Sequence, residues 1–343
     1  MPDQSVSRRQ FLTGLGMTTL AIPLSARTGL ADGKRANDAP RSIGIGGGTS
    51  SSLLYPPFDL SYFDTPVSPA PSDIRYGYAA ITWGGDDLQA IKDISSLGFP
   101  GIQLRANILR DFGTKPEALK ELLGQNSLEF VALSSGGIKM TPGREQDEIL
   151  LHAGNGKFLA DAGGRYLQVT DAGRVKGKRP SPDDYKRLGN LLTEIGQRVT
   201  DLGVRLGYHN HMGTLGQSAD EVGRIMDEAD PKYVKLELDI AHYFQGGGDP
   251  VRAIRNYEDR LLFLHLKDVQ RLSSAEGYQF VELGKGLVDV PAVVTALEQV
   301  RFRGWAVVEL DSVPDQERKA GRTPKDCAIE NKKFLEEHIG AKF

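Results

Sequence analysis

Residues 205–268 repeat one design three times: Arg205-Leu-Gly-Tyr-His209-Asn-His211, then Val234-Lys-Leu-Glu-Leu-Asp239-Ile-Ala-His242, then Leu261-Leu-Phe-Leu-His265-Leu-Lys267-Asp268. In each string a short apolar run gives way to imidazole or carboxylate side chains. The string Trp305-Ala-Val-Val-Glu309-Leu-Asp311 repeats the design a fourth time. Short apolar runs separated by helical periodicity are typical of parallel βα units. Because catalytic side chains of such folds gather where the strands end, we expect these polar side chains to share one site.

The same alternation extends in both directions, from about Arg75 to the C-terminus. Eight apolar runs cover residues 78–82, 101–104, 129–133, 166–169, 205–208, 234–238, 261–264 and 306–308. Amphipathic stretches begin near Asp86, Lys115, Arg144, Asp183, Ser218, Asp249, Asp289 and Thr323. The clearest, from Asp183, places Tyr185, Leu188, Leu192, Ile195, Val199 and Leu202 on one stripe. Eight strands alternating with eight helices predict a single (β/α)8 TIM barrel over residues 73–343.

Length, charge and composition agree with a globular protein. The chain has 343 residues, 39% hydrophobic content and a formal net charge of -3, which suffice for a large packed core. Nucleic-acid binding demands a basic surface, whereas the one basic stretch, residues 174–179, is short and is expected to be a solvated loop. The N-terminal apolar run, residues 12–24, falls short of a membrane span.

Residues 1–31 differ in kind from the rest of the chain. Ser7-Arg8-Arg9-Gln10-Phe11-Leu12 precedes a weakly hydrophobic run and resembles a twin-arginine export signal, although Thr13 replaces the lysine often found after the motif. Cleavage is expected after Ala31, with Ala26 as the second choice. This predicts export of a folded protein by the twin-arginine machinery to the periplasm or beyond, and the single Cys327 excludes an intrachain disulfide.

Residues 32–72 are rich in Gly, Ser and Pro, including Gly46-Gly47-Gly48. This composition predicts a linker that becomes an extended arm near residues 54–63, where aromatic side chains could pack on the barrel.

Four motifs give the region from about Arg75 onward a resemblance to a known superfamily. They are Leu-Asp239-Ile-Ala-His242, His265-Leu-Lys267-Asp268, Leu283-Gly284-Lys285-Gly286-Leu-Val-Asp289 and Gly304-Trp305-Ala-Val-Val-Glu309, in this order. In these the chain resembles the xylose-isomerase-like TIM barrels, which include sugar phosphate isomerases/epimerases, keto-sugar epimerases, inosose dehydratases and apurinic endonucleases. The Gly284-Lys285-Gly286 segment lacks the context of a phosphate-binding loop, and we interpret it as a turn before a helix capped by Asp289.

The resemblance implies a divalent metal ion, either Mn, Zn, Mg, Co or Fe. By motif position Asp239, His265 and Glu309 would be ligands, with His209 as the fourth and His211 as an alternative to it. Imidazole and carboxylate are common ligands of these metals. Glu237, two residues before Asp239 on the same strand face, is expected one layer deeper, as an indirect partner or in an interior ion pair.

The fifth-strand position departs from the epimerase pattern. Keto-sugar epimerases use glutamates from strands five and eight as two bases, whereas Tyr-His209-Asn-His211-Met-Gly looks like the inosose dehydratase pattern. The resemblance implies a metal-dependent carbohydrate isomerase or epimerase that forms an enediolate from a keto-sugar or cyclitol. A one-base lyase or dehydratase, including keto-glycoside elimination, and a non-catalytic periplasmic sugar-binding barrel are the alternatives. A nuclease would need a basic surface that this composition does not supply.

Further roles are assigned by position at the strand ends. Glu309, His242, His211 and Lys267 are the candidate catalytic residues, Lys267 either stabilising an oxyanion or forming a structural ion pair. The candidate substrate contacts are Trp83, Arg105, Asn107, Gln168, Asp171, His211 and His242. The substrate is expected to be a small carbohydrate, and the resemblance also implies a homodimer.

Overall fold

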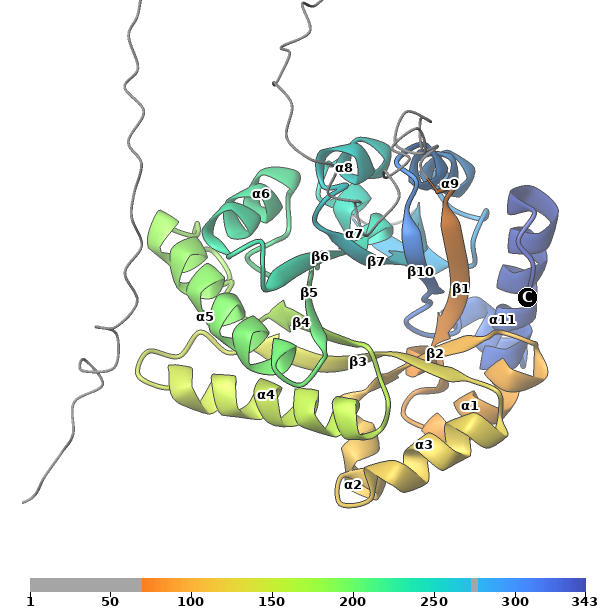
Figure 1. Ribbon diagram of the computed structural model, residues 1–343. Coiled ribbons are helices and arrows are strands. Elements are labelled where there is room, and N and C mark those ends of the chain that lie inside the picture. Colours follow the sequence, from red (N-terminus) through yellow and green to blue (C-terminus); the bar gives the residue numbers. More distant parts are fainter. Residues whose placement is uncertain (1–69, 273–276) are drawn as a thin grey trace, which may run out of the picture. The chain divides into compact units, whose positions relative to one another are not determined.

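The computed structural model describes residues 70–272 and 277–343. The predicted export signal and almost all of the predicted linker and arm lie outside the described residues. Eight parallel strands close into a barrel in the order β1-β10-β7-β6-β5-β4-β3-β2, and helices surround it (Figure 1). The predicted (β/α)8 barrel is confirmed. Within the described ranges no helix is long and apolar enough to cross a membrane.

The barrel strands are β1 (Asp73–Ala79), β2 (Gly101–Arg105), β3 (Glu129–Ile138), β4 (Tyr166–Asp171), β5 (Arg205–His209), β6 (Val234–Asp239), β7 (Leu261–Leu266) and β10 (Arg303–Val308). Seven of them overlap the expected apolar runs closely. The first lies earlier than the expected 78–82, because residues Asp73–Tyr78 pair with Arg303–Val308 of β10. The chain then turns through the 3-10 helix η2 (Ala80–Trp83), which ends at Gly84 with a φ of 65° that favours glycine.

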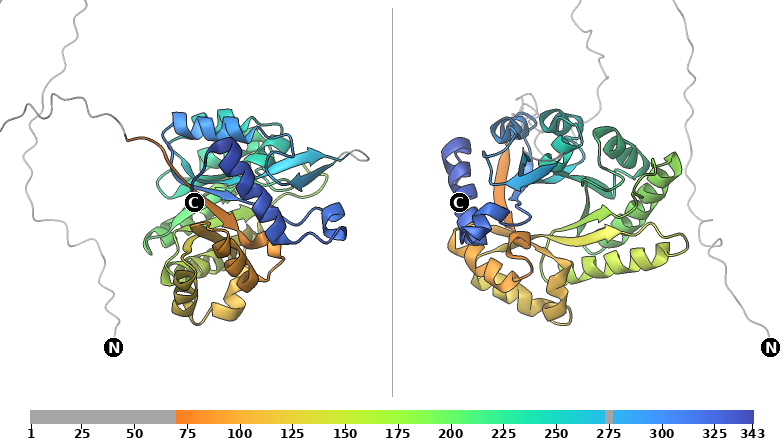
Figure 2. Two further views of the ribbon diagram at one scale, coloured as in Figure 1. Left: turned by 90° about the vertical axis from the view of Figure 1, so that its right-hand side faces the viewer. Right: turned by 180° about the vertical axis from the view of Figure 1, so that it is seen from behind.

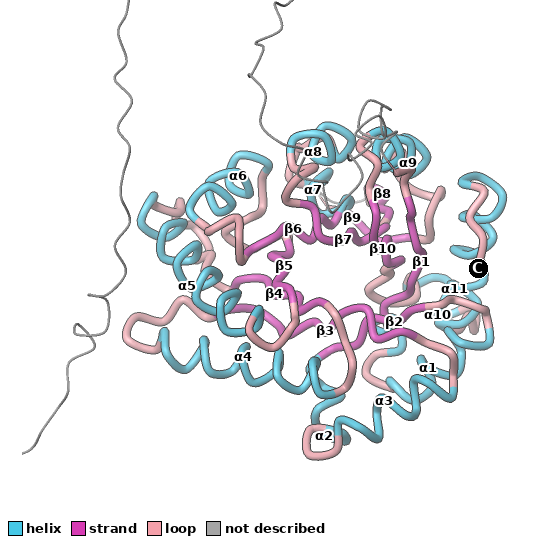
Figure 3. The backbone as a smooth tube through the Cα atoms, viewed as in Figure 1, coloured by secondary structure: helices cyan, strands magenta, loops and turns pink. Residues whose placement is uncertain are grey.

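The helices form the outer layer of the barrel (Figure 3). The longer ones are α1 (Asp87–Ser96), α3 (Pro116–Gln125), α4 (Glu145–Asp161), α5 (Pro182–Thr200), α6 (Ala219–Glu228), α8 (Pro250–Asn256), α9 (Val290–Gln299) and α11 (Pro324–Phe334). Each begins within a residue or two of its predicted start. Ser181, Ser218 and Thr323 form capping boxes, which satisfy amide groups at the helix N-termini. Helix α5 ends at Thr200, so Leu202 is exposed beyond it instead of continuing the buried stripe.

Short elements that the sequence pattern did not predict lie mostly near the strand ends. They are η3 (Ala106–Ile108), α2 (Leu109–Phe112), α7 (Ile240–Gln245), α10 (Asp315–Lys319), a π-helical turn η4 (Leu335–Ile339) and the antiparallel hairpin of β8 (Asp268–Arg271) and β9 (Tyr278–Val281). The turn before Asp289 is present as predicted, and the Asp289 side chain accepts a hydrogen bond from the Ala292 amide.

Buried Asp268 anchors the hairpin to the following turn. Its carboxylate accepts hydrogen bonds from the backbone amides of Val269, Gly284, Gly286 and Val288. The Asp268 carboxylate thereby satisfies four backbone amides, and it ties the start of the hairpin to the turn before α9.

Candidate active site

Strand register places the predicted ligands side by side. His209 ends β5 opposite Glu237, and Asp239 ends β6 opposite His265 of β7. Glu309 follows β10 directly, and its amide donates to the Leu266 carbonyl. All five side chains are buried. The ligand atoms of His209, Asp239 and His265 lie within 4.8 Å of one another, a spacing that could hold a metal ion.

Four buried polar atoms at this centre have no hydrogen-bond partner: His209 Nδ1, Glu237 Oε1, Asp239 Oδ2 and His265 Nδ1. His265 Nδ1 lies 3.5 Å from Glu237 Oε1, 3.6 Å from Asp239 Oδ2 and 3.4 Å from Glu309 Oε1. His209 Nδ1 contacts the other Glu237 oxygen. Leaving such atoms unpaired in the interior is costly, and a divalent cation would satisfy carboxylate and imidazole together. The donor set therefore fits a divalent metal ion.

The carboxylates of this centre shift the pKa values of the groups around them. Burial alone would lower the pKa of His265, but the charges of Glu237 and Glu309 raise it well above its usual value. Burial alone would raise the pKa of Glu309, but His265 and Lys267 lower it well below its usual value. Both directions show a centre that attracts positive charge.

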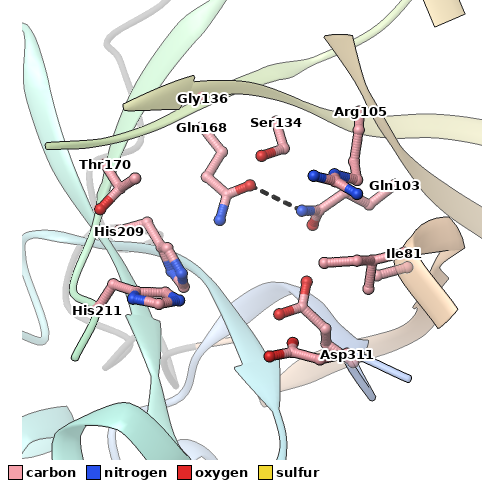
Figure 4. A pocket seen from close by; sticks show the side chains of 12 residues that line it. Ile81, Gln103, Arg105, Ser134, Gly136, Gln168, Thr170, His209, His211 and Asp311 are labelled. Carbon is pink, nitrogen blue, oxygen red and sulfur yellow. Dashed lines mark hydrogen bonds between the residues drawn. The ribbon is translucent and has the colours of Figure 1, made fainter. Parts of the chain in front are cut away.

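A chain of buried amides orients His265. His265 Nε2 lies 2.9 Å from Gln103 Oε1, Gln103 Nε2 donates to Gln168 Oε1 at 2.8 Å, and Gln168 Nε2 donates to Glu237 Oε2 at 3.1 Å. Figure 4 shows the bond between the two glutamines. Because the Gln103 side-chain oxygen can only accept a hydrogen bond, His265 must donate from Nε2. This series of hydrogen bonds orients the His265 ring with Nδ1 toward the carboxylates.

Lys267 is almost fully buried and paired with carboxylates. Its Nζ donates to Glu309 Oε1 at 2.8 Å and to Asp311 Oδ1 at 2.6 Å, and it lies 4.2 Å from the centroid of the Phe280 ring. Burial opposes its charge, but Glu309, Asp239 and Asp311 raise the pKa of Lys267 above its usual value. The structural ion pair, one of the two roles expected for Lys267, is present, and the ammonium remains charged.

Two further histidines stand next to the centre. His211 Nδ1 is 2.7 Å from the Met212 carbonyl, which fixes the proton there and leaves Nε2 as an acceptor. The rings of His211 and His242 have centroids 3.8 Å apart. Burial and the neighbouring His209 lower the pKa of His211, and burial lowers the pKa of His242 well below its usual value. Both imidazoles are therefore neutral near pH 7.

A cavity of about 210 Å³ opens over the centre (Figure 4). Its lining includes His209, Glu309 and three of the predicted substrate contacts, which are His211, Arg105 and Gln168. Roughly 300–1,000 Å³ is usual for drug-sized ligands, so this smaller cavity suits a single sugar or cyclitol ring.

Three expected substrate contacts have structural partners outside this lining. Trp83 is buried, and its indole Nε1 donates to Asp93 Oδ2. Asn107 donates to Asp87. Asp171 accepts from the Tyr208 hydroxyl and from the amides of Gly173 and Leu215. His242 also lies behind the lining, against His211 and Lys267.

Several lining residues were not predicted from the sequence. Ile81, Gln103, Ser134, Gly136 and Thr170 are such residues, whereas Asp311, which also lines the cavity, belongs to a strand-end string that was expected to contribute to the site. The sequence could have indicated Gln103 as a site residue, because it is a polar residue inside the apolar run of a strand. Ser134 and Gly136 had none, since β3 extends five residues beyond the expected run.

Buried histidines and carboxylates at the strand ends of a TIM barrel give this protein the donor set of a metal-binding barrel. Comparison of the sequence with protein families agrees: the xylose isomerase-like TIM barrel family matches residues 91–338. The chain belongs to this family.

Curated relatives include inosose dehydratases. That of Lacticaseibacillus casei is 27% identical over 296 residues, covering 77% of this chain and 96% of its own length. That of Geobacillus kaustophilus is 26% identical over 276 residues, covering 70% and 88%. The chain is an enzyme, and these relatives favour the lyase alternative over the isomerase or epimerase that we expected first.

Solved structures share the fold at low identity. The IOLI protein with a binding zinc atom has a TM-score of 0.67 at 17% identity and covers 78% of this chain and 99% of its own. A D-tagatose 3-epimerase-like protein has a TM-score of 0.63 at 15% identity, covering 78% and 97%. A probable 3-DHS dehydratase from Bacillus anthracis has a TM-score of 0.62 at 16% identity, covering 76% and 98%.

Proposed function

We propose that the protein is a divalent-metal-dependent lyase that removes water from a keto-sugar or cyclitol ring. The observation that carries the proposal is the single uncommitted base in the cavity. Among the cavity-lining residues, Glu309 and Asp311 are both paired with Lys267, and His209 contacts Glu237. Of the two imidazoles that line the cavity, His209 contacts Glu237 and would be a metal ligand, whereas neutral His211 has no hydrogen bond at Nε2 within the described residues. Epimerisation by two bases on opposite faces lacks its second base here, whereas elimination needs one.

His209, Asp239, His265 and Glu309 would hold the metal ion, and the two imidazoles favour Zn²⁺, Mn²⁺, Co²⁺ or Fe²⁺ over Mg²⁺. Such an ion would polarise the substrate carbonyl and acidify the hydrogen on the adjacent carbon. Gln103 keeps the His265 tautomer fixed through its hydrogen bond.

His211 would act as the base. Its Nε2 accepts the proton from the carbon beside the carbonyl, and it returns this proton to the hydroxyl that leaves from the next carbon. One C–H bond and one C–O bond break, a C=C bond forms, and water leaves, so the step balances without a second acid. His242 packs against His211 and positions the ring. Gln168 and Arg105, which line the same cavity, would supply donors toward the ring hydroxyls.

The experiment combines metal analysis with turnover of an inosose. The wild-type chain is expected to bind about one divalent ion per chain by mass spectrometry and to release water from the inosose, followed by NMR. Asp239→Asn should lose the ion. His211→Gln should keep the ion but lose about 10²–10⁴-fold in rate, the usual contribution of a general base. The exposed His338→Gln is the matched control.

Three outcomes would overturn the proposal. An isomerised product with no loss of water would restore the isomerase. Full activity of His211→Gln would remove the assigned base. A chain that binds sugars without metal or turnover would support the sugar-binding barrel.

Export and pairing rest on the sequence alone. We propose that residues 1–31 direct the folded chain through the twin-arginine route to the periplasm and that the barrel forms a homodimer. Replacing Arg8 and Arg9 by lysine should retain the precursor in the cytoplasm, as measured by cell fractionation, and sedimentation of the purified protein should give twice the chain mass.

A further inference from the structure

A second cavity adjoins the first on the side of the hairpin. Its volume is about 540 Å³, more than twice the 210 Å³ of the cavity over the metal-type centre. Asp311 lines both cavities. Because Asp311 Oδ1 accepts from Lys267, the boundary between the cavities lies at the catalytic cluster itself.

Strand β9 lines part of this second cavity. Tyr278 and Phe280 share one face of the strand, and both line the cavity together with Gln279 between them. Phe280 places the second cavity next to the buried cluster behind the first one, since its ring lies 4.2 Å from Lys267 Nζ and 5.1 Å from the His242 ring. Arg271, paired with Tyr278 across the hairpin, has its guanidinium carbon 5.7 Å from the tyrosine ring and braces it.

The other lining residues of the second cavity come mostly from α10 and the segment before it, and most of them are polar. Gln316 and Lys319 of this helix, with Ser312 before it, line the same cavity. Figure 2 (left) shows the light-blue hairpin and the dark-blue segment with α10 projecting from the same end of the barrel. A lining that combines aromatic rings with hydrogen-bonding side chains suits a sugar ring, which has an apolar face and a rim of hydroxyls.

We infer that the second cavity binds a second sugar ring, so that the substrate is a glycoside of the keto-sugar or cyclitol. This inference rests on the proposed lyase activity and names its leaving group. The C–H bond beside the carbonyl and the C–O bond at the next carbon break, and a C=C bond forms. The departing sugar takes the proton in place of the hydroxide that would otherwise leave as water. The products are an unsaturated ketone and a free sugar, with no oxidant or water consumed.

Turnover of two substrates tests the inference. The probes are an inosose and the same inosose carrying a glucosyl group on the hydroxyl at the carbon that loses its substituent. The kcat/KM for the two-ring compound should exceed that for the one-ring compound at least tenfold. Tyr278→Ala should lower this ratio about tenfold, equivalent to about 1.4 kcal/mol, and Lys319→Ala should lower it severalfold. Gln270→Ala, in the same hairpin but outside the lining of the second cavity, should leave the ratio unchanged.

Binding of inert sugars separates this inference from the proposed function. Methyl glucoside and methyl cellobioside carry no carbonyl group, so their affinities, measured by NMR titration, do not depend on catalysis. Tighter binding of the two-ring sugar that disappears in Tyr278→Ala supports the second subsite, even if no keto compound is turned over and the lyase activity fails. Equal affinities of the two sugars, or an advantage that survives both Tyr278→Ala and Lys319→Ala, would overturn the inference.

Discussion

The buried amide of Gln103 is the most direct test of how this barrel builds its metal-type centre. Gln103 makes two buried hydrogen bonds, one with His265 Nε2 at 2.9 Å and one with Gln168 Oε1 at 2.8 Å. Gln103→Leu keeps much of the side-chain volume and removes both bonds. Two buried groups lose their partner, at about 1–3 kcal/mol each, so unfolding should become easier by about 2–6 kcal/mol.

The same substitution should weaken metal binding. Without the Gln103 oxygen, His265 is no longer held with Nδ1 toward Asp239 and Glu237. Loss of a partner that orients a metal-ligating histidine usually costs 10–100-fold in metal affinity, about 1.4–2.7 kcal/mol. The affinity for Zn²⁺ is measured by competition with a chromogenic chelator, and stability by urea unfolding of the chelated protein.

Asn331→Leu is the matched control. Asn331 is also a buried amide with two hydrogen bonds, donating to the Tyr78 hydroxyl and accepting from the Leu283 amide, both at 2.8 Å. Its loss should destabilise the barrel by a similar amount without changing metal affinity. The reasoning is refuted if Gln103→Leu retains wild-type affinity, or if Asn331→Leu loses as much affinity as Gln103→Leu.

Three further predictions concern stability, each measured by urea unfolding. Lys267→Met should cost about 3–5 kcal/mol because it leaves the buried Glu309 carboxylate without its cation; an unchanged midpoint would contradict this. Burial lowers the pKa of His152 below its usual value of 6.5, so the unfolded chain binds the extra proton first as the pH falls. At pH values under about 6.5 the free energy of unfolding should therefore decrease, by at most about 1.4 kcal/mol per pH unit for this group. The decrease should be less steep in His152→Gln. Gly101→Ala should cost about 1–3 kcal/mol, because the new methyl group would lie 2.4 Å from Trp305; a wild-type midpoint would show that the indole can move.

The repeating elements of the barrel were predictable because local signals coincide there. Helix starts at Ser181, Ser218 and Thr323 carry their own capping side chains, which satisfy amides whatever the helix packs against. The first strand was misplaced because residues 80–83 are as apolar as a strand. These residues form the 3-10 helix η2 instead, because β1 pairs with β10 over residues 73–78 and the Thr82 hydroxyl donates to the Leu310 carbonyl.

The centre was predictable in part for the same reason. Asp239 and His265 end their strands, so parallel register alone brings them together. Trp83 and Asn107 follow strand ends and Asp171 is the last residue of β4, yet their side chains turn to Asp93, Asp87 and Tyr208, respectively. Strand position specifies the edge of the sheet on which a residue lies, but the rotamer depends on partners that are distant in sequence.

The sequence by itself determined the barrel, the order of its strands and helices, and the four strand ends that carry histidine and carboxylate, because hydrophobic period and helix capping are local properties. Only the tertiary structure decided that Gln103 orients His265, from which it is 162 positions away in the sequence. It also decided that Lys267 pairs with Glu309 and Asp311 and that the hairpin lines a second cavity. These contacts form between elements far apart along the chain, and barrel closure and loop packing, which no local pattern encodes, set their geometry.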